Sequence, residues 1–397
     1  MRINNNLKYS ILVHYSEIGL KKNNRKFFEN KFVNNIKSHL YDLIFSKISL
    51  ISARVIIKDI EFNRWPEYKK SLKNIMGMGN ATLMIESETD LASIKHSIDS
   101  LLEGKSFDNF RVTTKRHYKE FEKTSLETNI YFGDYIQKKT NKPVNLSNPE
   151  TNFIIELLKD KSYVGFDKIK GYGGLPANSQ EKALSLISSG IDSPVASFEI
   201  IKRGVTLDYI HFHSYPAINR QSISNVKEIV KKLLNYQIHT TLYLVPLLEV
   251  QQEIMNKIDE KFWVIFFRRA MVSIANILAN KNKLIALVTG ESVGQVASQT
   301  LSNIRAIDEV SQLPILRPLS GMNKEEIINK ASNINTYTLS IKPHQDCCSH
   351  FVPIHPETKA KIERIRMIDK KLDLEPFYYK AIDEIESISM SYKKEGK

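Results

Sequence analysis

A six-residue polar turn, SSGIDS at residues 188–193, has the residue types and the position that suit the binding of an anion. The apolar run at residues 183–188 is typical of a strand buried on both faces. A helix is expected to follow, with Ser193 as its N-cap, Pro194 in the first helical position and Gly204 at its end. At such a helix start the backbone N–H groups have no helical partner and the dipole is positive, so a phosphate can bind there. The turn is neither a Walker A loop nor a Rossmann loop, because Gly-Lys-Ser/Thr and G-x-G-x-x-G are both absent.

This turn resembles the PP-loop, S-G-G-x-D-S, of the ATP pyrophosphatases, which cleave ATP to AMP and pyrophosphate. Ser189 stands where that pattern has its first glycine, and serine is small enough to keep the backbone approachable. The resemblance implies that five residues of the turn bind ATP: Ser188, Ser189, Gly190, Ile191 and Ser193. It also implies a catalytic Asp192 that helps to hold Mg²⁺ at the departing phosphates. The alternative for Asp192 is a purely turn-stabilising role.

The elements that must position this turn follow from the hydrophobic pattern after residue 176. Strands are expected at residues 183–188, 205–212, 240–245 and 284–289. Helices are expected between them, at residues 194–203, 219–234 and, as one long helix, 249–280. This alternation indicates an α/β unit with a parallel, doubly wound sheet that binds ligands at the carboxyl ends of its strands. The loops at 188–193, 211–214 and 289–294 each follow a predicted strand, so we expect them at one edge of the sheet.

The first part of the chain has the pattern of a small α+β unit. A strand at residues 8–15 precedes a helix whose apolar residues recur every four positions from Phe28 to Leu40. A strand at 48–60, a helix at 67–76 and a strand at 81–87 follow, in an order that suggests a ferredoxin-type fold. The stretch GYGGLPANS at residues 171–179 is rich in Gly and Pro and is the expected linker.

Composition places the chain among ordinary globular proteins of two or three domains. It has 397 residues, of which 42% are hydrophobic and 25% charged. No uninterrupted apolar run approaches the roughly 20 residues that span a bilayer, and the N-terminus lacks signal-peptide features, so a cytoplasmic location is expected. The two cysteines, Cys347 and Cys348, are adjacent, which excludes a disulfide framework and a CxxC metal knuckle; no resident metal site is expected.

The positive charge is concentrated near the N-terminus. The net charge is +13, and residues 1–75 hold 15 Lys and Arg against 6 Asp and Glu. Such an excess suits the phosphate backbone of a nucleic acid, although a merely solvated basic face would look the same. The residues expected to contact nucleic acid are Lys21, Lys22, Arg25, Lys26, Lys115 and Arg116.

Several separated blocks, in order, resemble one family, the tRNA 4-thiouridine synthetases or tRNA sulfurtransferases. They are ILVHYSEIGLKKNNRKFFE, LISSGIDSPVA, HFHS, FFRRAM, TGESVGQVASQTLSNI, LRPLSGMNKEEII and DCCSHFVP. The resemblance implies a ferredoxin-like domain at residues 1–75, an RNA-binding THUMP domain at 76–172 and a PP-loop ATP pyrophosphatase domain at 173–397. It also implies that ATP adenylates the C4 oxygen of uridine 8 in tRNA, after which sulfur displaces AMP and leaves 4-thiouridine.

The resemblance also assigns further residues. Those implied to bind ATP outside the turn are Leu186, Ile187, His211, Phe212, Arg268, Gly290 and Gln299. Lys324 is implied to steady charge in the transition state, and Cys348 or Cys347 to take part in sulfur transfer. Longer family members carry the persulfide on a rhodanese domain, for which this chain has no room and no third cysteine. A separate persulfide-carrying sulfurtransferase or free sulfide is therefore the expected sulfur donor.

Two other functions remain open at this point. The chain could bind tRNA without catalysis, with Ser189 as the first sign of lost turnover, or could use ATP pyrophosphatase chemistry on another acceptor. The family resemblance further implies a homodimer and, in some organisms, a role in thiamine biosynthesis.

Overall fold

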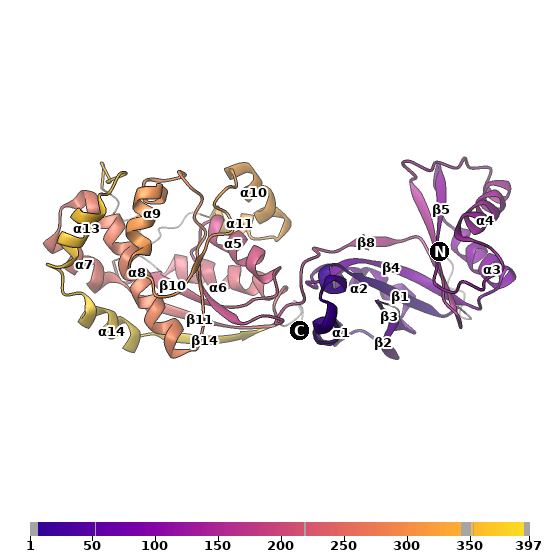
Figure 1. Ribbon diagram of the computed structural model, residues 1–397, viewed down its shortest axis with the longest axis horizontal. Coiled ribbons are helices and arrows are strands. Elements are labelled where there is room, and N and C mark those ends of the chain that lie inside the picture. Colours follow the sequence, from indigo (N-terminus) through magenta and orange to yellow (C-terminus); the bar gives the residue numbers. More distant parts are fainter. Residues whose placement is uncertain (1–6, 52, 218–219, 343–350, 352, 393–397) are drawn as a thin grey trace. The chain divides into compact units, whose positions relative to one another are not determined.

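The computed structural model describes residues 7–51, 53–217, 220–342, 351 and 353–392. The chain divides into two compact units, unit 1 at Met1–Leu175 and unit 2 at Pro176–Lys397. Figure 1 shows the elements of each unit.

Unit 1 is built on one mixed sheet in the order β2-β3-β1-β4-β7-β6-β5, with β8 paired to β4. Its strands are β1 (Tyr9–Tyr15), β2 (Lys47–Ile51), β3 (Arg54–Lys58), β4 (Met78–Ser87), β5 (Phe110–Arg116), β6 (Thr151–Leu157), β7 (Ser162–Gly165) and β8 (Lys168–Lys170). Its α-helices are α1 (Arg25–His39), α2 (Trp65–Lys73), α3 (Leu91–Leu102) and α4 (Ser125–Thr140). The pairing of β4 with β7 makes the ferredoxin-like half continuous with the half that contains β5, β6 and β7.

The main core of unit 1 lies between this sheet and its helices. Ile11 and Val13 of β1 alternate into it, and Phe32 and Ile36 of α1 pack against the same face, as the spacing predicts. The single strand predicted at residues 48–60 is wrong, because β2 and β3 form a hairpin there. Ala53, in the turn, has φ +67°, a left-handed conformation that glycine or asparagine usually signals. An alanine gives no such signal.

Unit 2 has the predicted parallel sheet, in the order β13-β12-β9-β10-β11-β14; β14 is antiparallel, and the other strands that the structure describes are parallel. Its strands are β9 (Lys182–Leu186), β10 (Thr206–His213), β11 (His239–Pro246), β12 (Leu287–Val288), β13 (Ile315–Leu316) and β14 (Glu386–Ser391). Its helices are α5 (Asp192–Ile201), α6 (Gln221–Leu233), α7 (Leu248–Lys257), α8 (Trp263–Lys281), α9 (Leu301–Asp308), α10 (Lys324–Asn333), α11 (Tyr337–Ser340), α13 (Ile362–Asp369) and α14 (Glu375–Asp383).

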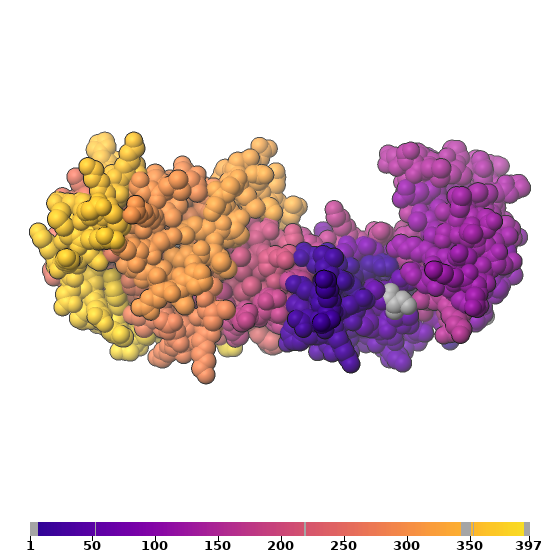
Figure 2. Space-filling model, viewed as in Figure 1, coloured from indigo at the N-terminus to yellow at the C-terminus, as the bar shows by residue number. Residues whose placement is uncertain are grey.

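Helices cover both faces of the unit 2 sheet. Helices α7, α8, α9, α13 and α14 form one group, and α5, α6, α10 and α11 form the other (Figure 1). In the space-filling view, the orange and yellow segments that follow β12 make up most of the visible surface of unit 2 (Figure 2). The doubly wound class is thus confirmed for this unit.

The long helix predicted at residues 249–280 is wrong in one respect, because it is two helices. Helix α7 ends at Lys257, and a 3-10 turn, Glu260–Phe262, leads into α8. The segment Glu260–Lys281 is long and apolar enough to cross a membrane, but 72% of its apolar window is buried inside the structure. Its apolar side chains, among them Phe266 and Phe267, belong to the core of unit 2. The segment is therefore a core helix.

Candidate active site

A cavity of about 210 Å³ lies at the carboxyl ends of β9, β10 and β12. After β9 the chain continues to β10 on one side and later returns to β12 on the other, so β9 adjoins the switch point where such sheets bind ligands. Ten residues assigned from the sequence line it: Leu186, Ile187, Ser188, Asp192, Ser193, His211, Phe212, Arg268, Gly290 and Gln299. Seven lining residues were not assigned: Ile210, Met271, Val272, Thr289, Glu291, Ile307 and Arg317.

The polar turn after β9 is closed by its own hydroxyl groups. Ser193 Oγ accepts a hydrogen bond from the backbone N–H of Ser188 at 2.9 Å and lies 3.1 Å from Ser188 Oγ. The prediction that Ser193 caps the helix is wrong, because α5 already begins at Asp192, and the Ser193 hydroxyl bonds back to Ser188 at the other end of the turn instead. Gly204, with φ +86°, does follow the end of this helix, as expected. Ser189 is fully buried, so the fold accommodates the departure from the PP-loop pattern.

Gly290 brings the loop after β12 against the start of α5. A Cβ atom at this position would lie 2.7 Å from Ser193 N and 2.8 Å from the carbonyl carbon of Asp192. Only glycine allows this approach of two backbones. The third predicted loop therefore contacts the first directly, as the shared sheet edge required.

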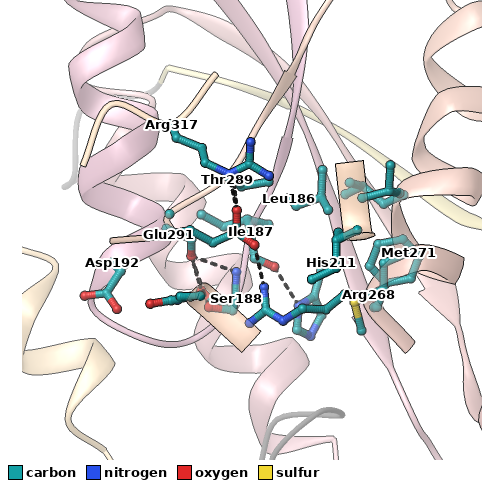
Figure 3. Close-up of a pocket in the computed structure, with 17 residues that line it drawn as sticks. Leu186, Ile187, Ser188, Asp192, His211, Arg268, Met271, Thr289, Glu291 and Arg317 are labelled. Carbon is teal, nitrogen blue, oxygen red and sulfur yellow. Dashed lines mark hydrogen bonds and ion pairs between the residues drawn. The ribbon is translucent and has the colours of Figure 1, made fainter. Parts of the chain in front are cut away.

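The carboxylate of Glu291 connects two arginines at the cavity (Figure 3). Its Oε1 accepts from Arg268 Nη1 at 2.8 Å, and its Oε2 accepts from Arg317 Nε and, at 3.0 Å, from Thr289 Oγ1. Burial alone would raise the pKa of Glu291, but the charges of Arg268 and Arg317 outweigh it and lower the pKa. Glu291 is therefore charged at neutral pH.

Asp192 lies at one end of the cavity and Met271 at the other (Figure 3). Both oxygens of Asp192 are engaged: Oδ1 accepts from Lys324 Nζ at 2.6 Å and Oδ2 from Gln295 Nε2 at 2.9 Å. Two of the predicted catalytic residues, Asp192 and Lys324, thus form an ion pair at the start of α5. The cavity has a charged end beside the anion-binding turn, and around Met271 an apolar end with the character that a nucleoside base prefers.

His211 is buried and holds the end of β9. Its Nδ1 lies 3.0 Å from the carbonyl oxygen of Ile187, which can only accept, so Nδ1 carries the proton and donates it. This contact fixes the ring beside the cavity and suits the binding role that the sequence suggested.

Cys347 and Cys348 lie outside the described residues. Among the side chains that the structure describes, no group of three or more His, Cys, Asp or Glu residues is placed to hold a metal ion.

The six predicted nucleic-acid contacts come from two regions of unit 1, and their environments differ. Lys22 and Lys26 are exposed at the start of α1, whereas Lys21 Nζ lies 4.9 Å from the centre of the Phe28 ring. Arg25 donates to Glu29 at 2.7 Å and also to Tyr15. The exposed lysines are thus the least constrained cations of this region.

Lys115 and Arg116, at the end of β5, project to opposite faces of the sheet because they are neighbours on a strand. Lys115 pairs with the buried Glu156 at 3.2 Å. Arg116 Nη1 donates to the carbonyls of Lys119, Phe121 and Lys123, so this guanidinium organises the loop after β5.

Comparison with known proteins matches both units to described families. The family model "Thiamine biosynthesis protein (ThiI)" matches residues 178–374, "ThiI ferredoxin-like domain" matches 10–81 and "THUMP domain" matches 88–167. A "Probable tRNA sulfurtransferase" of Acetivibrio thermocellus is 38% identical over 391 residues, covering 97% of this chain and 100% of that protein. One of Bacillus licheniformis is also 38% identical, covering 98% and 97%.

Solved structures show the same similarity. A crystal structure of "a 4-thiouridine synthetase - RNA complex with bound ATP" superimposes with a TM-score of 0.87 at 33% identity, covering 97% of this chain and all of that chain. PH1313 from Pyrococcus horikoshii, at 22% identity and a TM-score of 0.61, shares the fold. The expected fold class, with a ferredoxin-like part, a THUMP domain and a PP-loop domain, is confirmed by these matches.

Proposed function

From the premise that the chain belongs to the ThiI family of tRNA sulfurtransferases, we propose how its residues divide the work of the reaction. The protein is an enzyme of ATP-dependent tRNA thiolation: it binds ATP and tRNA and transfers sulfur to the tRNA. The observation that carries the assignment of residues is the cavity at the strand ends, which has an anion-binding turn at one end and an apolar lining at the other.

We place the triphosphate of ATP at the turn and the base at the apolar end. The start of α5 offers backbone N–H groups and a positive dipole to the β- and γ-phosphates. Arg268, from α8, faces the same cavity and supplies a guanidinium to the phosphate next to the ribose. Ile187 and Phe212 border the adenosine, and His211 fixes the strand end beside it.

The chemistry then has two steps. The C4 oxygen of uridine 8 attacks the α-phosphorus of ATP, the bond from that phosphorus to the bridging oxygen breaks, and pyrophosphate leaves. A sulfur nucleophile next attacks C4, the C–O bond breaks, and AMP leaves with the former carbonyl oxygen. Adenylation is needed because an amide-like carbonyl oxygen is a poor leaving group until it is bonded to phosphorus. The turn and Lys324 stabilise the negative charge that develops on pyrophosphate.

Mg²⁺ accompanies ATP in this proposal. Mg²⁺ is typically bound by one or two carboxylates together with substrate phosphates, and Asp192 is the carboxylate placed at the turn. Each oxygen of Asp192 accepts one hydrogen bond and keeps a second lone pair, so the carboxylate could hold the ion while Lys324 stays beside the phosphates. The ion would neutralise charge on the departing pyrophosphate.

The remaining assignments concern partners. The basic start of α1, with Lys22 and Lys26, contacts the tRNA backbone. The sulfur comes either from free sulfide, which attacks C4 directly, or from the terminal sulfur of a persulfide on a separate carrier. In the second case the thiol of Cys348 or Cys347 attacks the inner sulfur, the S–S bond to the transferred sulfur breaks, and a disulfide with the carrier forms. We also propose a cytoplasmic location and, from the family alone, a homodimer, which light scattering would test. A role in thiamine synthesis is a further proposal at family level, tested by thiamine auxotrophy of a deletion strain.

The experiment that tests the proposal is pyrophosphate release from ATP with unmodified tRNA, with the same tRNA carrying cytidine at position 8, and with no tRNA. We expect release only with the unmodified tRNA that has uridine 8. Equal release of pyrophosphate in all three reactions would indicate that the enzyme adenylates an acceptor other than tRNA. If the protein binds tRNA but releases no pyrophosphate, it is a tRNA-binding protein without this activity.

A further inference from the structure

The two arginines at Glu291 differ in how many of their donors are used. All three guanidinium nitrogens of Arg317 are engaged: Nε donates to Glu291, Nη1 to Asp308 at 2.9 Å, and Nη2 to the other oxygen of Asp308. Arg268 donates through Nη1 to Glu291, while its Nε is buried and has no hydrogen-bond partner among the described residues. Arg317 is therefore a fixed structural cation, and Arg268 keeps donors for another group.

The free donors of Arg268 form one edge of its guanidinium. Nε and Nη2 lie side by side, and such a pair suits two oxygens of a phosphate or carboxylate. A buried N–H without a partner costs free energy, and an anionic ligand would remove that cost. Arg268 lines the cavity, so the missing acceptor belongs there.

Glu291 is placed to fix the direction in which the Nε–Nη2 edge of Arg268 points. The residue directly follows Gly290, whose backbone packs on the start of α5, and its side chain is only 6% exposed. One carboxylate oxygen holds Arg268, while the other is held by Arg317 and Thr289. The position of Arg268 is thus tied through Glu291 to the same backbone that forms the anion-binding turn.

We propose that Glu291 is a positioning residue for ATP: it holds Arg268 by Nη1 so that Nε and Nη2 face the phosphate in the cavity. This inference rests on the proposed function, since it takes ATP as the ligand. Glu291 does not touch the phosphate in this arrangement, because two like charges would repel. Without its carboxylate, the guanidinium groups of Arg268 and Arg317 would lose the anion between them, and Arg268 would be free to turn away.

The test compares Glu291→Gln with a matched control, Glu309→Gln. Glu309 is also a carboxylate of unit 2 that accepts from two arginines, Arg269 and Arg366, but it does not line the cavity. The dissociation constant for ATP is measured by calorimetry without tRNA, and the melting temperature is measured in parallel. We expect Glu291→Gln to weaken ATP binding about 10- to 100-fold, the range for a lost charge-assisted contact, and Glu309→Gln to leave it unchanged.

A double variant separates positioning from general damage. If Glu291 acts through Arg268, then Arg268→Met/Glu291→Gln binds ATP no more weakly than Arg268→Met alone. Independent losses that multiply in the double variant would overturn the inference. So would a Glu291→Gln protein that melts lower but binds ATP as tightly as the wild type.

Two further measurements cover the cases in which Glu291→Gln does not fold or the wild-type protein does not bind ATP. If Glu291→Gln does not fold, Thr289→Val removes only the hydroxyl that orients the carboxylate; we expect about a threefold weaker affinity for ATP, and an unchanged affinity contradicts the inference. Wild-type protein that fails to bind ATP would refute the proposed function itself, whereas wild-type binding with no effect of either variant refutes only the role of Glu291.

Discussion

The replacement Glu156→Gln in unit 1 should destabilise that unit strongly. Glu156, on β6, is fully buried and has four basic partners. Its carboxylate lies 2.7 Å from Arg54, 3.0 Å from His14, 3.2 Å from Lys115 and 3.3 Å from His117. His14 and Arg54 come from β1 and β3, while Lys115 comes from β5, so one side chain connects strands from both halves of the sheet.

The size of the effect follows from the pKa of this carboxyl group. Burial alone would raise the pKa of Glu156, but the hydrogen bond from His14 and the charge of Arg54 outweigh it and lower the pKa from 4.5 to about 2. At about 1.4 kcal/mol for each pH unit, the charged form is favoured in the folded state by about 3 kcal/mol. A glutamine cannot supply this charge, and it leaves Arg54 buried without its acid, so we expect a loss of about 3 kcal/mol at pH 7.

The lowered pKa of Glu156 also determines how the stability of unit 1 depends on pH. A lowered acid pKa stabilises the fold fully above the ordinary value of 4.5, and this contribution disappears as the pH falls towards 2. The difference in stability between wild type and Glu156→Gln should therefore narrow between about pH 5 and pH 2. The pKa of His117 is also lowered, by burial and by Arg54, so its protonation destabilises the wild-type fold on acidification.

Urea unfolding followed by tryptophan fluorescence can measure the free energy of unfolding of unit 1 alone. Trp65 is in unit 1, where its Nε1 donates to Asp167 at 2.7 Å, and Trp263 is in unit 2, so a Trp263→Phe background leaves one reporter. The control is Glu88→Gln, which removes an exposed carboxylate that pairs with Lys161. If Glu156→Gln costs less than about 1 kcal/mol, the value for exposed ion pairs, the reasoning from burial is refuted.

Three further predictions concern the site and the tRNA contact. Gly290→Ala should abolish ATP binding, because its Cβ would lie 2.7 Å from Ser193 N; unchanged binding in calorimetry would contradict the packing of the two loops. Asp192→Asn should slow pyrophosphate release about 100-fold or more and leave tRNA affinity unchanged in filter binding, whereas equal losses of both would make the residue structural. The double replacement of Lys22 and Lys26 by Glu should weaken tRNA binding about tenfold and lower its salt dependence, and an unaltered salt slope would remove these lysines from the interface.

Much of the fold could be predicted because each element carries a local signal. Short, mostly apolar runs place β9, β10 and β11, and the four-residue spacing of apolar residues places α1. The hairpin between β2 and β3 was missed because its turn contains Ala53 rather than a turn residue. The break between α7 and α8 was missed for a similar reason, since the segment contains neither Gly nor Pro, and Ile254, Ile258 and Phe262 keep the four-residue spacing of a helix across it.

The site could be predicted only in part. Residues of the turn, Arg268 and Gly290 stand in recognisable motifs, and the parallel sheet explains why they meet. Glu291 and Arg317 also lie in blocks that resemble the family, but their role depends on contacts of the loop after β12 with α8 and with the segment after β13, which lie far from it in the sequence. A single sequence does not show that contact. The residue type offers one usable signal, since a glutamate three residues after a buried strand needs a cationic partner if it is buried as well.

The most direct test of the central claim is nucleoside analysis of unmodified tRNA after incubation with the protein, ATP, Mg²⁺ and sodium sulfide, repeated with a persulfide-carrying sulfurtransferase in place of sulfide. The account predicts 4-thiouridine at position 8 with at least one donor, and none with Asp192→Asn or without ATP. Absence of 4-thiouridine with both donors, although the protein binds ATP and tRNA, would contradict it.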